Sequence, residues 1–316
     1  MDALIIMIKN VLVFVALAVP AWILVKTKLL APDQSTALSK ILLYVGMPFL
    51  VFSNTMNVKF TGETAKWIVV TLALSLVISV VSYFLSVPVT SMEKDAKKRG
   101  MMRFCITSSN SGFLGIPLTV AVFGADSLVT TYLIAVNIVT NTVMYTLGAY
   151  LVSQDKRTVS VTKSVINPVL LAFVAGLICS LLKVPERVPM VATYGTHFTN
   201  VVTPLSMSVI GMKLGGAKFS TLFKGWKTYY TSALKLLGLP LITTAICLAL
   251  YFLGWLPAEV VLAMFMFAAM PTASLASTFA DNYGGDTEGA VSNTLASTAF
   301  SVATIPLLYW VLCALL

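Results

Sequence analysis

The sequence predicts an all-α polytopic membrane protein of ten transmembrane helices, arranged as two inverted repeats of five helices. Three observations lead to this prediction: a low content of charged residues, apolar stretches bounded by charges, and prolines and asparagines that recur at one offset. Of the 316 residues, 58% are hydrophobic and only 10% are charged, whereas a soluble domain carries about 25% charged residues. So few charges cannot cover a water-facing globule of this size, and lipid is the expected surrounding.

Ten apolar stretches lie between the charged residues, and each approaches or exceeds the roughly 20 residues that cross a hydrocarbon core. Eight stretches contain no charged residue, and the first and eighth contain one lysine each. Numbered one to ten, these predicted spans are residues 3–25, 41–58, 67–92, 104–125, 127–154, 164–182, 188–212, 228–258, 260–280 and 289–316. Ala16-Leu17-Ala18 resembles a signal cleavage site, but Met1-Asp2 offers no basic region before the apolar run, which favours a retained first helix.

The distribution of basic residues predicts that both termini lie outside the cell membrane. With an outer N-terminus, only Lys59, Lys66, Lys183 and Arg187 fall in outer loops, and most of the other basic residues fall in inner loops. The last inner loop, residues 281–288, has no basic residue and does not support the positive-inside rule, by which basic residues concentrate in inner loops. The net charge of +9 is therefore interpreted as topological, and no nucleic-acid partner is expected.

The two halves of the chain, residues 1–155 and 156–316, are predicted to be repeats. Matching spans share residues about 155 positions apart, namely Pro32 with Pro185, Pro48 with Pro204, Pro117 with Pro271, and Asn137 with Asn293. Because five spans is an odd number, the second copy must enter the membrane from the opposite side. Inverted repeats are typical of secondary transporters, whose site lies at the midplane between the repeats.

Spans four and nine are each predicted to contain a break near the middle. In span four, Gly112 and Gly115 add backbone freedom and Pro117 removes a hydrogen-bond donor. Span nine carries Met270-Pro271-Thr272-Ala273-Ser274 at the corresponding place. A single break is as consistent with a structural kink as with a binding site. A matched pair of interrupted helices indicates a transporter site.

A broken helix exposes unpaired N–H groups at the start of its second piece, and these groups and the helix dipole favour an anion. Pro117 suits the first turn of such a restart. We therefore expect a small carboxylate to bind backbone amides, hydroxyls and Asn110. Asn137 and Asn141 of span five, and Asn293, Ser297 and Ser301 of span ten, either line this cavity or tie helices together. The full candidate set is Ser109, Asn110, Ser111, Gly112, Gly115, Pro117, Met270, Pro271, Thr272, Ser274, Asn137, Asn141 and Asn293.

Three motifs resemble those of the auxin efflux carrier family. The run from Asn110 to Pro117 resembles the fourth-span motif of this family, Ala269-Met270-Pro271 followed by residues 279–284 resembles the ninth-span motif, and Gly46-Met47-Pro48 resembles the second-span motif. The likeness in the number and order of spans covers essentially the whole chain.

The resemblance implies transport of an organic anion, such as indole acetate in the plant PIN-FORMED carriers or malate and malonate in bacterial permeases. It implies a fold shared with sodium/proton antiporters and bile acid symporters, with a panel of spans one, two, six and seven and a core of the others. Spans four and nine would cross at Pro117 and Pro271, Asn110 would lie at the substrate site, and the protein would form a homodimer. The long loop of many plant carriers is missing, which favours a compact bacterial member.

Two further ionisable residues within spans bear on the function. His197, the only histidine, is a candidate for proton coupling or a hydrogen-bonded residue near the outer end of span seven. Lys235 in span eight is a candidate anion partner, but its closeness to Lys227 favours a side chain that reaches the inner surface. Spans three, four and nine contain no acidic residue in their interiors, so the sequence shows no carboxylate relay for protons.

The sequence thus predicts a secondary transporter of a small organic carboxylate in the plasma membrane, coupled to a proton or sodium gradient or driven by electrochemical export. A sodium-coupled carrier like the bile acid symporters is an alternative, and a membrane sensor that binds the ligand without moving it is another. An enzyme is not expected, because no metal triad, no Ser/His pair on matched faces and no paired acids occur in a span. No metal or cofactor is expected.

Overall fold

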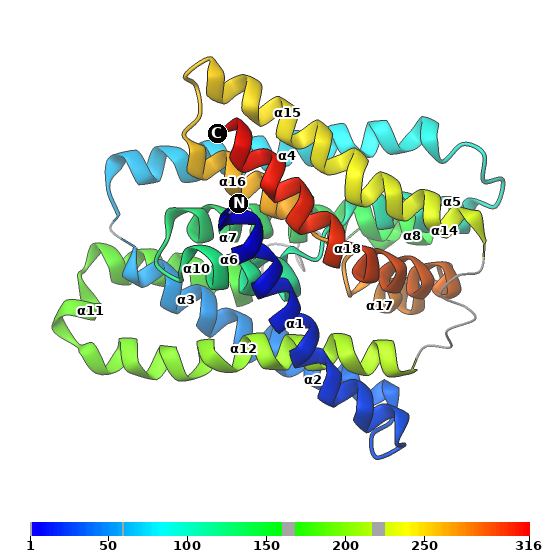
Figure 1. Ribbon diagram of the computed structural model, residues 1–316, viewed down its shortest axis with the longest axis horizontal. Helices are drawn as coiled ribbons and strands as arrows, with labels where there is room; N and C mark the ends of the chain where they lie inside the picture. Colours follow the sequence, from blue (N-terminus) through cyan, green and yellow to red (C-terminus); the bar gives the residue numbers. More distant parts are fainter. Residues whose placement is uncertain (1, 59, 160–167, 217–224) are drawn as a thin grey trace.

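The computed structural model describes residues 2–58, 60–159, 168–216 and 225–316, which form helices joined by short connections (Figure 1). Up to residue 159 the α-helices are α1 (Asp2–Lys26), α2 (Ser35–Ile41), α3 (Met47–Asn57), α4 (Gly62–Val89), α5 (Ala96–Thr107), α6 (Ile116–Phe123), α7 (Leu128–Val143) and α8 (Ala149–Ser153). From residue 168 they are α10 (Pro168–Leu181), α11 (Val184–Arg187), α12 (Pro189–Gly216), α14 (Trp226–Ala233), α15 (Leu239–Phe252), α16 (Ala258–Ala268), α17 (Ala276–Tyr283) and α18 (Thr287–Leu315).

Within the described residues, six helical segments are long and apolar enough to cross a membrane, and they coincide with predicted spans one, two, three, five, eight and ten. They are Leu4–Lys26, Pro32–Asn57, Gly62–Val89, Leu128–Ser153, Trp226–Phe252 and Thr287–Leu315. Shorter apolar helices at Ser111–Phe123, Pro168–Leu181 and Ala258–Ala268 fall in predicted spans four, six and nine. The prediction of an all-helical, multi-pass membrane protein is confirmed. Residues 164–167 of predicted span six, and residues 160–163 before them, lie outside the described residues.

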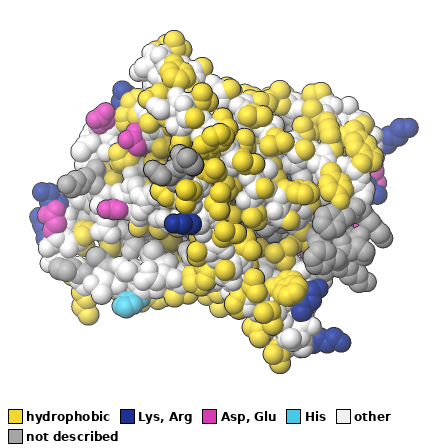
Figure 2. Space-filling view, in the orientation of Figure 1, with side chains coloured by type: hydrophobic (Ala, Val, Ile, Leu, Met, Phe, Trp, Pro, Cys, Tyr) yellow, Lys and Arg dark blue, Asp and Glu magenta, His cyan; other side chains and the backbone are white. Residues whose placement is uncertain are grey.

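Helix α4 shows how the polarity of the structure is inverted relative to a soluble protein. Its buried face carries Thr71, Ser75 and Ser79, whereas Val69 and Phe84 on the other face are 64% and 65% exposed. The buried hydroxyls bond within the helix, as Ser79 Oγ does to the Ser75 carbonyl at 2.7 Å. Small polar residues inside and large apolar residues outside suit a helix that packs on its neighbours in lipid. Figure 2 shows apolar side chains across the middle of one face, with charged side chains mainly toward its edges.

Four of the predicted spans contain a single π-helical turn in their described parts: η2 (Leu42–Gly46), η3 (Ser111–Gly115), η4 (Met144–Gly148) and η6 (Leu234–Gly238). In three of them a proline follows the closing glycine by two positions, at Pro48, Pro117 and Pro240. Proline has no N–H to donate and its ring crowds the preceding turn, so that turn widens. The Gly-x-Pro pattern therefore places local π turns in spans two, four and eight, and π turns often occur at functional sites.

Helix α1 packs directly on α12 (Figure 1). A Cβ atom added to Gly211 of α12 would lie 2.1 Å from the Ala18 carbonyl oxygen of α1. Only glycine permits this approach, which is a common basis of helix packing in membranes.

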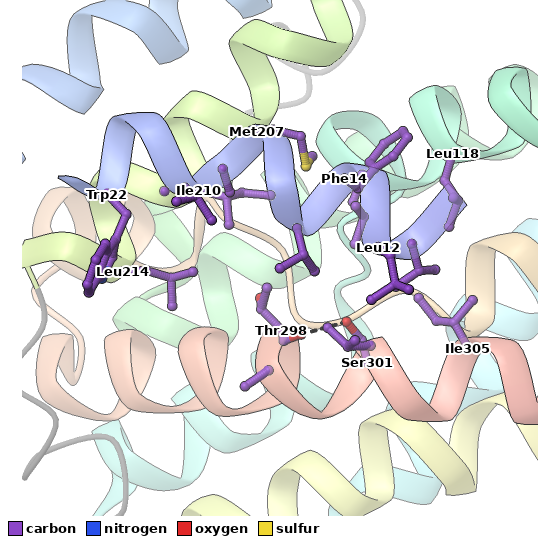
Figure 3. A pocket seen from close by; sticks show the side chains of 18 residues that line it. Leu12, Phe14, Trp22, Leu118, Met207, Ile210, Leu214, Thr298, Ser301 and Ile305 are labelled. Carbon is purple, nitrogen blue, oxygen red and sulfur yellow. Dashed lines mark hydrogen bonds between the residues drawn. The ribbon is translucent and has the colours of Figure 1, made fainter. Parts of the chain in front are cut away.

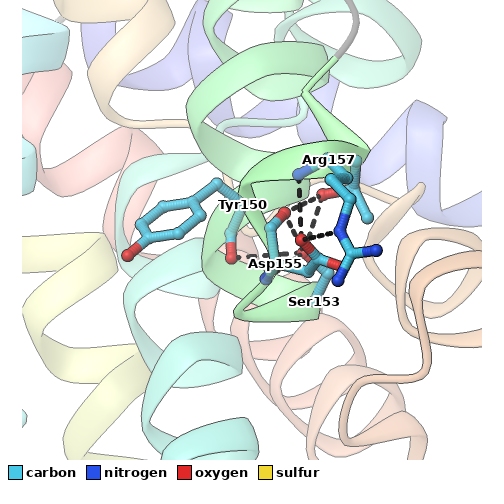
Figure 4. Close-up of polar contacts among 5 residues, drawn as sticks. Tyr150, Ser153, Asp155 and Arg157 are labelled. Carbon is cyan, nitrogen blue, oxygen red and sulfur yellow. Dashed lines mark hydrogen bonds and ion pairs between the residues drawn. The ribbon is translucent and has the colours of Figure 1, made fainter.

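A compact turn follows α8 at the end of the predicted first repeat (Figure 4). The Asp155 carboxylate accepts a hydrogen bond from the Arg157 backbone N–H at 2.9 Å and lies 3.4 Å from Arg157 Nε. The Ser153 and Thr158 hydroxyls are 2.7 Å apart. The Arg157 side chain is 92% exposed, so this ion pair adds little stability, and the turn rests mainly on its backbone hydrogen bonds.

Candidate functional site

Two non-helical segments, residues 108–110 and 269–275, meet inside the protein and are here called the paired segments. The first separates α5 from η3, and the second separates α16 from α17. Ser109 and Thr272 form an antiparallel bridge. The Asn110 N–H donates to the Pro271 carbonyl at 2.8 Å, and the Ala273 N–H donates to the Ser108 carbonyl at 3.0 Å. Backbone groups that lack a helical partner are thus satisfied by the other segment, as a low-dielectric interior requires.

Asn110 connects the two paired segments through both its side chain and its backbone. It is 4% exposed, and its Nδ2 donates to Ser274 Oγ at 2.8 Å. Its backbone carbonyl accepts the N–H groups of Leu114 and Gly115, both at 3.1 Å. Asn110 therefore starts the helical continuation through η3 and α6 and, at the same time, holds residue 274 of the opposite segment.

Each paired segment is also held by a polar side chain from a long helix. On α7, Asn137 Nδ2 donates to Ser111 Oγ at 2.8 Å, and Asn141 Nδ2 donates to Asn137 Oδ1 at 2.9 Å. On α18, Ser297 Oγ accepts the Thr272 N–H at 3.1 Å. These contacts fix the direction in which both helix restarts point.

A small cavity lies between the two restarts. Its volume is about 30 Å³, and its lining includes Asn110, Gly112, Phe113, Asn137, Asn141, Ala273, Ser274 and Leu275, closed by Leu43, Met47, Met144 and Val169. A neighbouring cavity has a volume of about 20 Å³. Ser109, Asn141 and Met144 line both cavities, and Ser79, Thr107 and Thr140 line the second one only. Each holds roughly one or two water molecules, far below the ~300 Å³ of a small-molecule pocket. Neither cavity is therefore large enough in this structure to hold a small-molecule substrate.

Backbone donors remain available at the first cavity. Among the described residues no acceptor is found for the N–H groups of Gly112 and Phe113, or for those of Ser274 and Leu275. All four residues line the cavity. Unpaired N–H groups at two helix starts are suited to an anion.

A family model described as "Membrane transport protein" matches residues 5–162 and 156–309. The chain belongs to this family of auxin efflux carrier-like membrane transport proteins. A protein of Methanothermobacter thermautotrophicus described as an uncharacterized transporter is 27% identical over 315 residues, which covers 95% of this chain and 96% of the relative. The resemblance stated from the motifs is confirmed, and the function is that of a membrane transporter.

Lys235 differs from its sequence-based interpretation. The prediction favoured a side chain that reaches the inner surface, but Lys235 is 0% exposed. Its ammonium donates to Ser109 Oγ and lies 3.4 Å from the Ala268 carbonyl oxygen. The π turn η6 carries the residue, and the side chain extends toward the paired segments instead of along the helix to water. The interpretation was wrong because distance along the sequence does not give the face of the helix.

Lys213 is a second basic residue that sequence analysis did not connect with the paired segments. It lies in the last turn of α12, and its ammonium donates to the Ser274 carbonyl at 2.6 Å. From its place at a predicted span end it was counted only as a loop charge. Its contact joins the second paired segment to a helix of the predicted panel.

Some sequence-predicted residues lie outside this group of contacts. The backbone pairing occurs at Ser109, and Pro117 lies beyond it in the first turn of α6. Gly115 faces Met270, since an added Cβ would lie 3.1 Å from Met270 Cγ. Asn293 donates to the Gly289 carbonyl of its own helix at 2.8 Å. His197 is exposed on α12, and none of its described contacts reaches the paired segments.

A separate cavity of about 570 Å³ lies between α1, α12, α6 and α18 (Figure 3). Apolar side chains such as Phe14, Trp22 and Ile210 surround it. The hydroxyls in its described lining, those of Thr298 and Ser301, bond to carbonyls of their own helix. The cavity is large enough for a ligand, but the described residues around it carry no charge to bind a carboxylate.

Proposed function

We propose that this protein is a secondary transporter that moves a small organic carboxylate by alternating access, with its site at the paired segments. The observation that supports this most strongly is the convergence of two helix starts, with free N–H groups and Asn110, on one cavity. Each helix start favours an anion by about 0.3–1 kcal/mol, and by up to ~2 kcal/mol when partly buried. Hydrogen bonds to a charged group add about 1.5–3 kcal/mol each.

The proposed site consists of the sequence-predicted residues of spans four and nine, supported by Asn137 and Asn141. Ser111 and Ser274 present hydroxyls, and Gly112 leaves its backbone open to the cavity, where an added Cβ would lie 3.4 Å from Asn137 Nδ2. The small volume supports a closed state in this structure. Substrate entry then requires spans four and nine to move relative to Leu43, Met47 and Val169, which close the cavity.

The proposed architecture is ten spans in two inverted repeats, residues 1–155 and 156–316, with the breaks of spans four and nine crossing at the site. In each half the predicted fifth span bonds to the break of the same half. The Asn137 amide donates to Ser111 Oγ in the first half, and Ser297 Oγ accepts the Thr272 N–H in the second half.

We further propose outer termini in the plasma membrane, a panel of spans one, two, six and seven, and a homodimer. The ion pair of Glu93 with Lys227, 2.7 Å apart, supports the placement of these two residues on the same side of the membrane, as the ten-span topology requires. The coupling ion is proposed to be a proton or sodium.

Counterflow in proteoliposomes tests the function. Vesicles loaded with unlabelled malonate, malate or indole-3-acetate should accumulate the same labelled acid from outside. A sensor that binds without transport would show binding and no counterflow. A sodium-coupled carrier like the bile acid symporters would require sodium on the substrate side, whereas a proton-coupled carrier would respond to a pH gradient alone.

A further inference from the structure

Lys235 is a buried cation next to the paired segments that the proposed site leaves unused. Its side chain is fully buried, and its ammonium contacts Ser109 Oγ, the Ala268 carbonyl and, at 5.9 Å, the ring of Phe267. All three partners are neutral. A buried charge without a counter-ion is costly, so its presence requires an explanation.

The described residues provide no counter-ion for Lys235. They form two ion pairs, Asp155 with Arg157 and Glu93 with Lys227. On the helices around η6 the acidic residues stand at helix ends, with Glu288 in the first turn of α18 and Glu259 in the first turn of α16. A counter-ion at this depth must therefore come from elsewhere.

Ser109 connects Lys235 to the cavities. Ser109 lines both small cavities, whereas Lys235 lines neither. A lysine ammonium can only donate, and a serine hydroxyl offers one donor and two acceptor positions. Since Ser109 Oγ accepts from Lys235, its own hydrogen is left free, and no described residue accepts it. That hydrogen is available to a group in the cavity.

We propose that Lys235 is the residue that makes this site selective for anions, acting through Ser109. The ammonium holds Ser109 Oγ as an acceptor, so the Ser109 hydroxyl donates to the substrate carboxylate, and the positive charge behind it is compensated when that carboxylate binds. Lys235 is thus a positioning residue. The inference rests on the proposed function, because it assigns a role toward the same carboxylate.

Without Lys235 the site keeps its amides and hydroxyls and the Lys213 ammonium, which donates to the Ser274 carbonyl at 2.6 Å, so we expect a smaller preference for a carboxylate over a neutral carboxamide of the same shape. Removing one partner of a buried charge pair typically weakens binding by roughly 30-fold or more. We therefore expect Lys235→Met to weaken binding of the carboxylate by this factor and to leave binding of the corresponding amide unchanged.

The experiment measures the affinity of purified protein, by calorimetry, for two pairs of probes: malonate with malonamide, and indole-3-acetate with indole-3-acetamide. Wild type should prefer the anion in at least one pair, and Lys235→Met should reduce that preference by roughly 30-fold. Lys235→Arg should retain part of it. Lys9→Met, which removes an exposed lysine from α1, is the matched control and should behave as wild type.

Ser109→Ala tests whether Lys235 acts through the Ser109 hydroxyl or through its charge alone. It should weaken anion binding in wild type and add little in the Lys235→Met background, because the two residues act as a unit. The ratio of anion to amide affinity does not depend on the folded fraction, so a purely structural role of Lys235 would leave it unchanged.

Unchanged anion preference in Lys235→Met, or fully additive effects of the two substitutions, overturns the inference and leaves the transport proposal intact. If wild type binds neither anion and also shows no counterflow with them, the proposed function fails, and the inference fails with it.

Discussion

The Asn110 side-chain amide donates to Ser274 Oγ at 2.8 Å and joins two residues that are 164 positions apart. This bond lies beside the backbone pairing of Ser109 with Thr272. It therefore links the two paired segments at the point where residues of both line the same cavity.

Replacement of Asn110 by aspartate is expected to abolish carboxylate uptake. The two side chains have the same shape, but the introduced carboxylate would place a negative charge where the anion binds and would lose the donor to Ser274. A loss of at least tenfold corresponds to about 1.4 kcal/mol. Uptake of labelled substrate per folded transporter measures it, and near-normal uptake by Asn110→Asp would remove this residue from the site.

Pro271→Ala is expected to impair transport more than stability. The new N–H lets α16 continue toward α17 as a regular helix, which competes with the pairing of the Pro271 carbonyl with the Asn110 N–H. Pro306→Ala, within the long helix α18, is the control for loss of an intrahelical proline. Transport rate and melting temperature are measured together. If Pro271→Ala lowers only the melting temperature, the proline is a structural kink.

Ser297→Ala should destabilise the protein by about 1–3 kcal/mol, because the Thr272 N–H would be buried without an acceptor. Ser301, one turn later on α18, bonds only to the Thr298 carbonyl at 2.7 Å among the described residues, so Ser301→Ala should have a smaller effect. Thermal unfolding in detergent compares the two variants. Equal melting temperatures would show that Ser297 does not support the second paired segment.

The Glu93–Lys227 ion pair is expected to stabilise the contact between the α4–α5 connection and the start of α14 in a pH-dependent way. The hydrogen bond from Lys227, aided by the Asp95 N–H, holds the pKa of the Glu93 carboxyl below its ordinary value of 4.5. A lowered pKa in the folded state gives stability that is complete above pH 4.5 and is lost as the pH falls through the folded value.

Glu93→Gln should therefore be less stable than wild type at pH 7 by up to about 1 kcal/mol, and the two should converge in acid. Asp155→Asn, at an ion pair whose side chains are 47% and 92% exposed, is the control and should change little. A difference between Glu93→Gln and wild type that stays constant from about pH 7 to about pH 3 would contradict this account.

Much of the fold can be predicted from the sequence because long stretches without charged residues identify the helices that cross a membrane. Six predicted spans coincide with long apolar helices among the described residues, and the irregular segments at residues 108–110 and 269–275 fall within the motifs singled out by glycine, serine and proline. The bond from Asn137 to Ser111 also joins two predicted site residues.

What the sequence did not reveal depends on helix rotation. Lys235 was assigned to the surface from its distance to Lys227, but its ammonium contacts Ser109. Lys213 was treated as a loop charge, but it donates to the Ser274 carbonyl. A helix turns by about 100° per residue. The direction in which a single side chain points can therefore be assigned only when the packing of the neighbouring helices is known. Of the polar residues named in span ten, Ser297 makes the supporting contact with Thr272, and Asn293 bonds within its own helix.

The central claim is that a carboxylate is bound at the paired segments and carried across the membrane. Its most direct test is counterflow of labelled malonate, malate or indole-3-acetate by proteoliposomes containing wild type, Asn110→Ala or the control Asn10→Ala, whose side chain is bonded on the exposed surface of α1. The account predicts counterflow of at least one acid by wild type and Asn10→Ala, and a loss of at least tenfold in Asn110→Ala. Absence of counterflow in wild type, or full activity in Asn110→Ala, would contradict it.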